Sequence, residues 1–192
     1  VHIAYEVSGA GAVSDDSLWH LLAFVRDSGL VEPAKRGPLD ALYGSLGGGN
    51  SLPPTPDLLK WKGLMRRHEA IAAARVCGVP EARLHFLELP LYNAAPRARS
   101  YGADDIARMS ALLNQVQPHL IYAAGDLDDP HGTHRLRLQV LRDTIAQAAQ
   151  QKSRWLAESE LWLYRGAWAE WPLDEIDLAV PLSPQEVLRR RR

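Results

Sequence analysis

Short apolar runs and amphipathic segments alternate along the chain. Apolar runs bounded by turn residues predict strands at residues 1–7, 84–89, 119–124, 160–164 and 176–180. Apolar residues that recur every three or four positions predict helices at residues 15–29, 55–76, 106–116 and 138–148. Because strands that alternate with such helices favour right-handed crossovers, the pattern predicts one α/β domain with a mainly parallel sheet, covered by helices on both faces. The strand at 119–124 is the one we expect to be buried on both faces.

Capping residues define the clearest predicted helix. Thr55 is a favourable N-cap residue, and Pro56 fits the first turn of a helix that runs to about Val76. Before this helix, residues 32–56 are rich in proline, glycine and small residues, which predicts a long irregular loop. The glycine run 47–49 is a weak candidate for a phosphate-binding loop, because no Lys-Ser or Lys-Thr follows it and no apolar strand precedes it.

The densest group of polar residues follows the predicted strand at 119–124. Residues 125–135 contain three carboxylates and two imidazoles, and ligands of parallel sheets gather beyond the carboxyl ends of strands. His131 precedes or begins a helix, where the positive end of the dipole favours the neutral imidazole that binds metals. His134, three residues further on, can face the same way. Aspartates before a helix are also common caps, so a capped surface loop is the alternative interpretation.

Two further features have both a structural and a functional interpretation. Arg66 and Glu69 have the spacing of a surface ion pair on a helix, but Arg66 is also suited to bind a sugar hydroxyl or a phosphate through its planar set of donors. Aromatic side chains near the carboxyl end either stack on a sugar ring or pack in the interior. These aromatic residues are Trp162, Tyr164, Trp168 and Trp171.

The composition limits the possible binding partners of the chain and its cellular compartment. The chain of 192 residues has a formal net charge of −1, so no whole-chain field attracts nucleic acid or an anionic membrane. Its one cysteine, Cys77, excludes an internal disulfide and any multi-cysteine metal site, and favours a reducing cytoplasm. No apolar run approaches the roughly 18 to 20 residues that span a bilayer. We therefore expect a cytoplasmic protein that binds neither nucleic acid nor membrane.

Several segments resemble a known family. Residues 66–80 resemble the Arg-x-x-Glu helix and Gly-Val turn of PIG-L/LmbE-type de-N-acetylases, and residues 86–90 resemble the strand that follows. Residues 129–134 resemble the second histidine motif of that family. Within the family, the closest resemblance is to the carboxyl-terminal de-N-acetylase-like region of glucosamine-6-phosphate deaminase-like fusion proteins. The segments that carry this likeness are 1–9, 121–126 and 164–183.

The resemblance implies a Rossmann-like three-layer sandwich that binds zinc or a similar divalent ion and hydrolyses the N-acetyl group of an amino sugar. In such enzymes a metal-bound water attacks the amide carbonyl. By motif, His131 would be a metal ligand and Arg66 a substrate-binding residue. His134 and Asp129 would orient the ligand.

One motif of the family is absent from the chain. The His-Pro-Asp-Asp sequence that supplies two metal ligands and the catalytic base does not occur, and the first strand here resembles the second strand of the family. A catalytic zinc site normally has three protein ligands. We therefore expect residues 1–192 to be a single domain that lacks the first strand and helix, to coordinate zinc incompletely, and to be inactive alone. No catalytic residue is assigned.

Two other functions remain open. In the second alternative, the domain has lost catalysis and binds a sugar phosphate or serves as a partner surface for a fused or associated deaminase domain. Glucosamine-6-phosphate deamination itself is the third alternative, and it would belong to an amino-terminal domain outside these residues.

Overall fold

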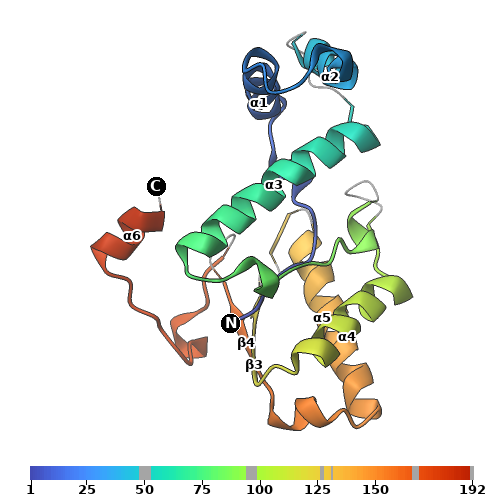
Figure 1. The fold of residues 1–192 in the computed structure, drawn as a ribbon. Helices are drawn as coiled ribbons and strands as arrows, with labels where there is room; N and C mark the ends of the chain where they lie inside the picture. The colour runs from blue at the N-terminus through green and yellow to red at the C-terminus, as the bar shows by residue number, and fades with distance from the viewer. Residues whose placement is uncertain (48–52, 94–98, 126–127, 131, 166–168, 191–192) are drawn as a thin grey trace. The chain divides into compact units, whose positions relative to one another are not determined.

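The computed structural model of the chain forms two compact units, residues 1–117 and 118–192 (Figure 1). The structure describes all residues except 48–52, 94–98, 126–127, 131, 166–168 and 191–192. Most of the glycine run at 47–49 therefore lies outside the described residues.

The first unit contains a pair of parallel strands, β1 (Ile3–Tyr5) and β2 (Leu84–Phe86). Ile3 is paired with Leu84, and Tyr5 is paired with Phe86. The rings of Tyr5 and Phe86 stack with centroids 5.0 Å apart, as aromatic cross-strand neighbours do. Backbone bonding extends beyond the strands, because the Leu87 N–H donates to the Tyr5 carbonyl at 2.9 Å. The predicted parallel pairing is thus present in this unit.

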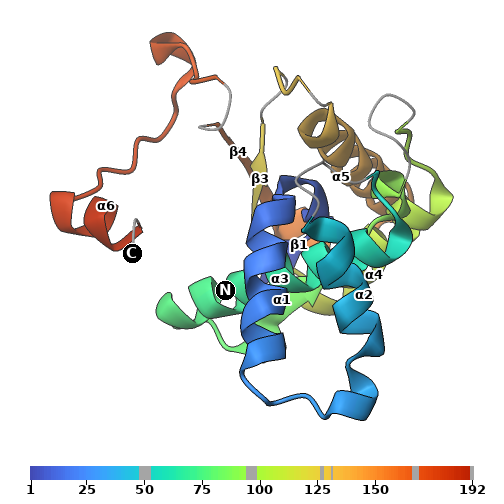
Figure 2. The same ribbon diagram turned by 90° about the horizontal axis from the view of Figure 1, so that it is seen from above.

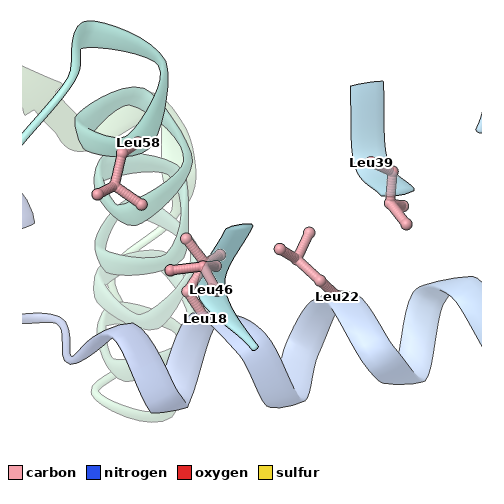
Figure 3. Packing of buried hydrophobic residues seen from close by; sticks show 5 residues of the cluster. All are labelled: Leu18, Leu22, Leu39, Leu46 and Leu58. Carbon is pink, nitrogen blue, oxygen red and sulfur yellow. The ribbon is translucent and has the colours of Figure 1, made fainter. Parts of the chain in front are cut away.

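Along the sequence, three helices separate β1 from β2: α1 (Asp15–Asp27), α2 (Gly37–Leu46) and α3 (Pro56–Val76). The helices α1 and α2 lie side by side (Figures 1 and 2). The predicted start of α3 is confirmed, since Thr55 Oγ1 accepts a hydrogen bond from the Leu58 N–H at 3.2 Å and Pro56 is the first helical residue. Five buried leucines of these helices form one hydrophobic cluster (Figure 3): Leu18, Leu22, Leu39, Leu46 and Leu58.

The helix α2 occupies much of the stretch 32–56, for which the composition predicted an irregular loop. That prediction was wrong for residues 37–46. Pro38 stands in the first helical turn, where the missing N–H has no helical partner in any case. Leu39 and Leu46 are each 7% exposed because they pack in the leucine cluster. Burial against neighbouring helices thus outweighs the weak local helix propensity of a glycine- and proline-rich segment.

The first unit ends with α4 (Ala103–Val116), which is tied to the segment after β2. The side chain of Asp105 is only 3% exposed. Its carboxylate accepts hydrogen bonds from the backbone N–H groups of Leu91 and Gly102, both at 2.9 Å. The bond from Gly102 satisfies a backbone donor at the start of α4, and the bond from Leu91 joins α4 to the chain beyond β2.

The second unit contains the parallel strands β3 (Leu120–Ala124) and β4 (Glu160–Tyr164), connected through α5 (Thr133–Gln150). A short helix, α6 (Pro184–Arg190), lies near the carboxyl end of the chain. The prediction that strand 119–124 is buried on both faces was wrong, since Tyr122 is 59% exposed. Among the described residues β3 pairs only with β4, so that its side chains lack the neighbours of a wider sheet.

The predicted strand at 176–180 is also absent. These residues have no regular structure and are exposed, with Val180 at 72%. An apolar run without a neighbouring strand has no partner for its backbone groups, and it therefore does not form a sheet.

Short 3-10 helices connect the main elements: η1 (Ala10–Ala12), η2 (Pro33–Lys35), η3 (Glu81–Arg83), η4 (Pro90–Tyr92), η6 (Arg154–Glu158) and η7 (Leu173–Glu175). The described residues thus mix helices with two short parallel sheets of two strands each, which agrees with the α/β class. The three-layer sandwich and the single domain remain predictions. No helix among the described residues is long and apolar enough to cross a membrane, and the cytoplasmic location stays a prediction.

Candidate functional site

The loop after β1 lies against α3 and brings polar groups to the carboxyl end of that strand. Gly9 has a positive φ of 67°, a conformation that glycine adopts without strain. A Cβ on Gly9 would lie 3.5 Å from Arg66 Nε, and a Cβ on Gly63 would lie 3.4 Å from Ser8 Cβ. The loop and the helix are therefore neighbours at these positions, and Ser8 and Arg66 lie at the same junction.

Arg66 forms the ion pair that its spacing predicted. Its Nη1 atom bonds Oε2 of Glu69, and the two side chains are 48% and 56% exposed. An exposed pair of this kind contributes about 0 to 1 kcal/mol to stability. The pair uses one terminal nitrogen of a guanidinium that carries five N–H donors, so donors remain for an anion. The role of Arg66 in substrate binding stays a prediction.

A second ion pair joins α3 to α1. Lys62 Nζ lies 2.6 Å from Asp15 Oδ1, and the two side chains are only 12% and 23% exposed. The charge of Lys62 is thus neutralised in a largely buried contact. At this junction the exposed positive charge therefore belongs to Arg66.

The carboxyl end of β2 is held in an unusual conformation next to the end of β1. The Leu89 N–H donates to the Glu6 carbonyl at 2.8 Å, so the two strand ends are neighbours. Glu88 has a positive φ of 47°, which costs a non-glycine residue roughly 1 kcal/mol or more. Arg108 Nη1 donates to the carbonyls of Leu87 at 2.9 Å and Glu88 at 3.0 Å, and these bonds stabilise the turn.

In the second unit the loop after β3 contains the predicted metal site. Asp129 is 5% exposed, and its Oδ2 atom accepts a hydrogen bond from the His134 N–H at 2.7 Å. The Gly132 N–H donates to the Asp129 carbonyl at 3.0 Å. Asp129 therefore caps the start of α5, as the structural alternative proposed. His134 is half-buried in the first turn of this helix.

His131 lies outside the described residues, so its assignment as a metal ligand stays a prediction. Within the described part of the chain, no group of three or more histidine, cysteine, aspartate or glutamate side chains is arranged to hold a metal ion. Asp129 already accepts a backbone hydrogen bond. The described residues of this loop thus do not make up the three protein ligands that a catalytic zinc site requires.

The aromatic residues of the second unit differ in their surroundings. The guanidinium of Arg165 lies 3.8 Å from the ring centroid of Trp171, and Arg165 Nε donates to the Gly125 carbonyl at 3.2 Å. Trp171 thus packs against Arg165, and a Cβ on Gly125 would lie 3.2 Å from its ring. Tyr164 is 55% exposed, and Trp168 lies outside the described residues. Packing is confirmed for Trp171, and sugar stacking stays a prediction for the others.

Several contacts of the first unit were not predicted from the sequence. His2 Nδ1 lies 2.9 Å from His85 Nε2, although the two residues are 83 positions apart. Lys62 and Arg108 bond to groups that are also distant in sequence. No local spacing signals such contacts, because they depend on strand register and helix packing.

Comparison with known proteins finds one informative relative. The chain is 34% identical over 200 positions, which include all of the chain, to a protein of Bacteroides thetaiotaomicron with the provisional name glucosamine-6-phosphate deaminase-like protein. The chain spans about 30% of the length of this relative. It resembles one segment of a longer deaminase-like protein. No protein family matches the chain, and no solved structure matches it.

The likeness to deaminase-like proteins inferred from the motifs is thereby confirmed, and it links the chain to proteins named for an amino-sugar phosphate. Membership of the PIG-L/LmbE family stays a prediction.

Proposed function

We propose that this chain is a non-catalytic region of a glucosamine-6-phosphate deaminase-like protein, and that it binds an amino-sugar phosphate. The observation that supports the proposal is the 34% identity with the deaminase-like relative, which extends over all 192 residues. The chain spans about 30% of that relative, so most of the longer protein lies outside the matched segment. We assign deamination to those other residues and ligand binding to these.

The junction between the loop after β1 and α3 is the proposed binding site. Its chemistry suits a sugar phosphate, because a guanidinium binds phosphate oxygens through two parallel hydrogen bonds and a hydroxyl binds sugar or phosphate oxygens. Arg66 provides the exposed guanidinium, and Ser8 provides an exposed hydroxyl close to Gly63. The position beyond the carboxyl end of a parallel strand is also where α/β sheets commonly bind ligands.

A binding titration tests the proposal. Glucosamine 6-phosphate is titrated into the 192-residue chain, with inorganic phosphate and glucosamine as separate probes. We expect Arg66→Gln to weaken binding of glucosamine 6-phosphate about tenfold or more, since a hydrogen bond to a charged group contributes about 1.5 to 3 kcal/mol. Arg75→Gln is the matched control, because Arg75 lies in the last turn of the same helix.

Two results would reject this assignment. One is the absence of glucosamine 6-phosphate binding by the wild-type chain. The other is equal affinity in the wild type, the Arg66 variant and the Arg75 control, which would place the ligand elsewhere.

A second candidate function is metal-dependent de-N-acetylation, favoured by the resemblance of residues 129–134 to the second histidine motif of the de-N-acetylases. Its test uses the full-length protein, with zinc content and acetate release from N-acetylglucosamine derivatives as the two measurements. If His131 is a ligand, His131→Ala should abolish both stoichiometric zinc and acetate release. Unchanged zinc content in that variant would reject the assignment of His131.

A further inference from the structure

The chain contains one extra residue immediately after β2. In a regular parallel pair, N–H groups two positions apart on one strand donate to carbonyls two positions apart on the other. The Leu87 N–H donates to the Tyr5 carbonyl at 2.9 Å. The Leu89 N–H, two positions further along, donates at 2.8 Å to the carbonyl of Glu6, which directly follows Tyr5. Glu88 is therefore the inserted residue of a β-bulge.

The bulge holds Glu88 in a conformation that glycine would adopt at less cost, with a φ of 47°. Among the described residues, Gln117 and Lys152 are the other non-glycine residues with a positive φ. Both lie at the carboxyl ends of helices, where a left-handed residue is common. Glu88 instead follows a strand. Strain of this kind is concentrated at sites that bind ligands, and bulges beside such sites re-aim a side chain.

The Glu88 carboxylate lies at the surface, where a ligand can reach it. The residue is exposed, whereas the next residue, Leu89, is only 1% exposed. Arg108 donates to the backbone carbonyl of Glu88 at 3.0 Å, and so it holds the bulge through the main chain. Within the part of the chain that the structure describes, the carboxylate itself forms no hydrogen bond or ion pair.

Glu88 lies close to the proposed sugar-phosphate site. The backbone hydrogen bond described above places the bulge beside Glu6, which stands three residues before Gly9. A Cβ on Gly9 would lie 3.5 Å from Arg66 Nε. Three residues of extended chain span at most about 10 to 11 Å, which is of the order of the length of a hexose phosphate. One ligand of this size can therefore contact groups at both positions.

The helix α3 also contacts both strands at this end. The guanidinium of Arg67 lies 4.0 Å from the ring centroid of Phe86, which stands two positions before Glu88. The preceding residue, Arg66, adjoins the loop after β1. A single helix thus places guanidinium groups beside the carboxyl ends of both strands.

We propose that Glu88 binds the ammonium group of the amino-sugar phosphate and gives the site its preference for an amino sugar over a neutral sugar. The inference rests on the proposed function, in which Arg66 binds the phosphate. Glucosamine 6-phosphate carries both a phosphate and an ammonium group, so it presents opposite charges to a guanidinium and a carboxylate. A charge-assisted hydrogen bond between ammonium and carboxylate adds affinity that glucose 6-phosphate, which has no amine, does not gain.

Parallel titrations of the 192-residue chain with glucosamine 6-phosphate and glucose 6-phosphate test this role. They are done at about pH 6.5, below the usual pKa of an amino group, so that the amine is protonated. We expect wild type to bind the amino sugar about tenfold more tightly. Glu88→Gln should lose this preference and keep the wild-type affinity for glucose 6-phosphate. Glu81→Gln is the matched control, an exposed glutamate of η3 that should keep the preference.

Glu88→Gly gives a second variant, in case glutamine alters the bulge. Glycine adopts a positive φ without strain, so this variant should have a higher Tm than wild type. It should at the same time lose the preference for the amino sugar. A purely structural role of Glu88 does not produce this combination.

The outcomes separate this inference from the proposed function. If wild type binds both sugar phosphates with equal affinity, or if both Glu88 variants keep the preference, the role of Glu88 is overturned and the phosphate site at Arg66 is not. If wild type binds neither sugar phosphate, the proposed function fails and the role of Glu88 fails with it.

Discussion

Replacing Asp105 by Ala should remove the carboxylate that joins α4 to the segment after β2. Two backbone N–H groups donate to this carboxylate at 2.9 Å, one from Leu91 and one from Gly102. Leu91 is 2% exposed, so water cannot easily replace the lost acceptor at its N–H. Gly102 is exposed, and its N–H can be hydrated after the substitution.

The expected loss of stability follows from these two environments. A buried donor left without an acceptor costs about 1 to 3 kcal/mol, and loss of a hydrogen bond that caps a helix costs about 1 kcal/mol. We therefore expect Asp105→Ala to lower the free energy of unfolding by about 3 kcal/mol. Asp105→Asn should have an intermediate effect, because the asparagine side chain has one acceptor oxygen in place of the two carboxylate oxygens that accept these hydrogen bonds.

Urea unfolding at constant pH measures the effect, with Asp104→Ala as the matched control. Asp104 lies in the same helical turn but is exposed, so its loss should remove only the favourable interaction with the helix dipole, about 0.3 to 1 kcal/mol. Hydrogen exchange at the Leu91 amide should accelerate in Asp105→Ala and not in the control. Equal destabilisation by the two Ala substitutions, together with unchanged Leu91 exchange, would refute the reasoning.

Three further predictions concern packing and pH. Leu22→Ala should destabilise the chain by about 2 to 5 kcal/mol in urea unfolding, whereas Phe24→Ala should have a much smaller effect, because Leu22 is 1% exposed and Phe24 is 68% exposed. Gly125→Ala should cost about 1 to 3 kcal/mol in the same assay, since its Cβ would lie 3.1 Å from the Cβ of a β4 residue. Because the pKa of His2 is lowered in the folded chain, the unfolded chain gains a proton more readily as the pH falls below 6.5, the ordinary pKa of histidine. The contribution of neutral His2 to the free energy of unfolding is therefore complete above that pH and is lost as the pH falls below it. Acidification should thus lower the Tm of wild type more than that of His2→Gln.

Local signals in the sequence were sufficient to predict some of the helices. The start of α3 was predictable because Thr55 and Pro56 act within one helical turn. The helix α2 was missed because its segment is rich in glycine and proline, while the burial that stabilises Leu39 and Leu46 depends on other helices. Propensity describes the isolated segment, but the leucine cluster forms only when α1 and α3 are also in place.

The same distinction applies to the candidate sites. The ion pair of Arg66 with Glu69 spans three positions, so helical geometry alone predicts it. The contact of His2 with His85 spans 83 positions and exists only because β1 pairs with β2 in one register. Three helices separate these strands in the sequence, so no turn between them fixes that register. Contacts assembled by strand pairing were therefore beyond prediction, whereas a contact within one helix was not.

Two basic residues of α3, Lys62 and Arg66, differ in how firmly an ion pair holds each side chain. Lys62 is held by Asp15 at 2.6 Å in a largely buried pair, whereas the partner of Arg66 is the exposed Glu69. Donors of the guanidinium remain beside Glu69, but a phosphate that also uses Nη1 competes with this carboxylate, and the exposed pair costs only about 0 to 1 kcal/mol to break.

On the proposed function, Glu69→Gln removes this competing carboxylate and should tighten binding of glucosamine 6-phosphate by up to about fivefold. The same titration as for Arg66→Gln measures the change, with Glu81→Gln as a control in η3, outside the helix. If Glu69→Gln instead weakens binding, then Glu69 contributes to the site by orienting Arg66 or by contacting the sugar. In that case Glu69 does not compete with phosphate for Arg66. The proposal that Arg66 is readily released from Glu69 to bind an anion then fails.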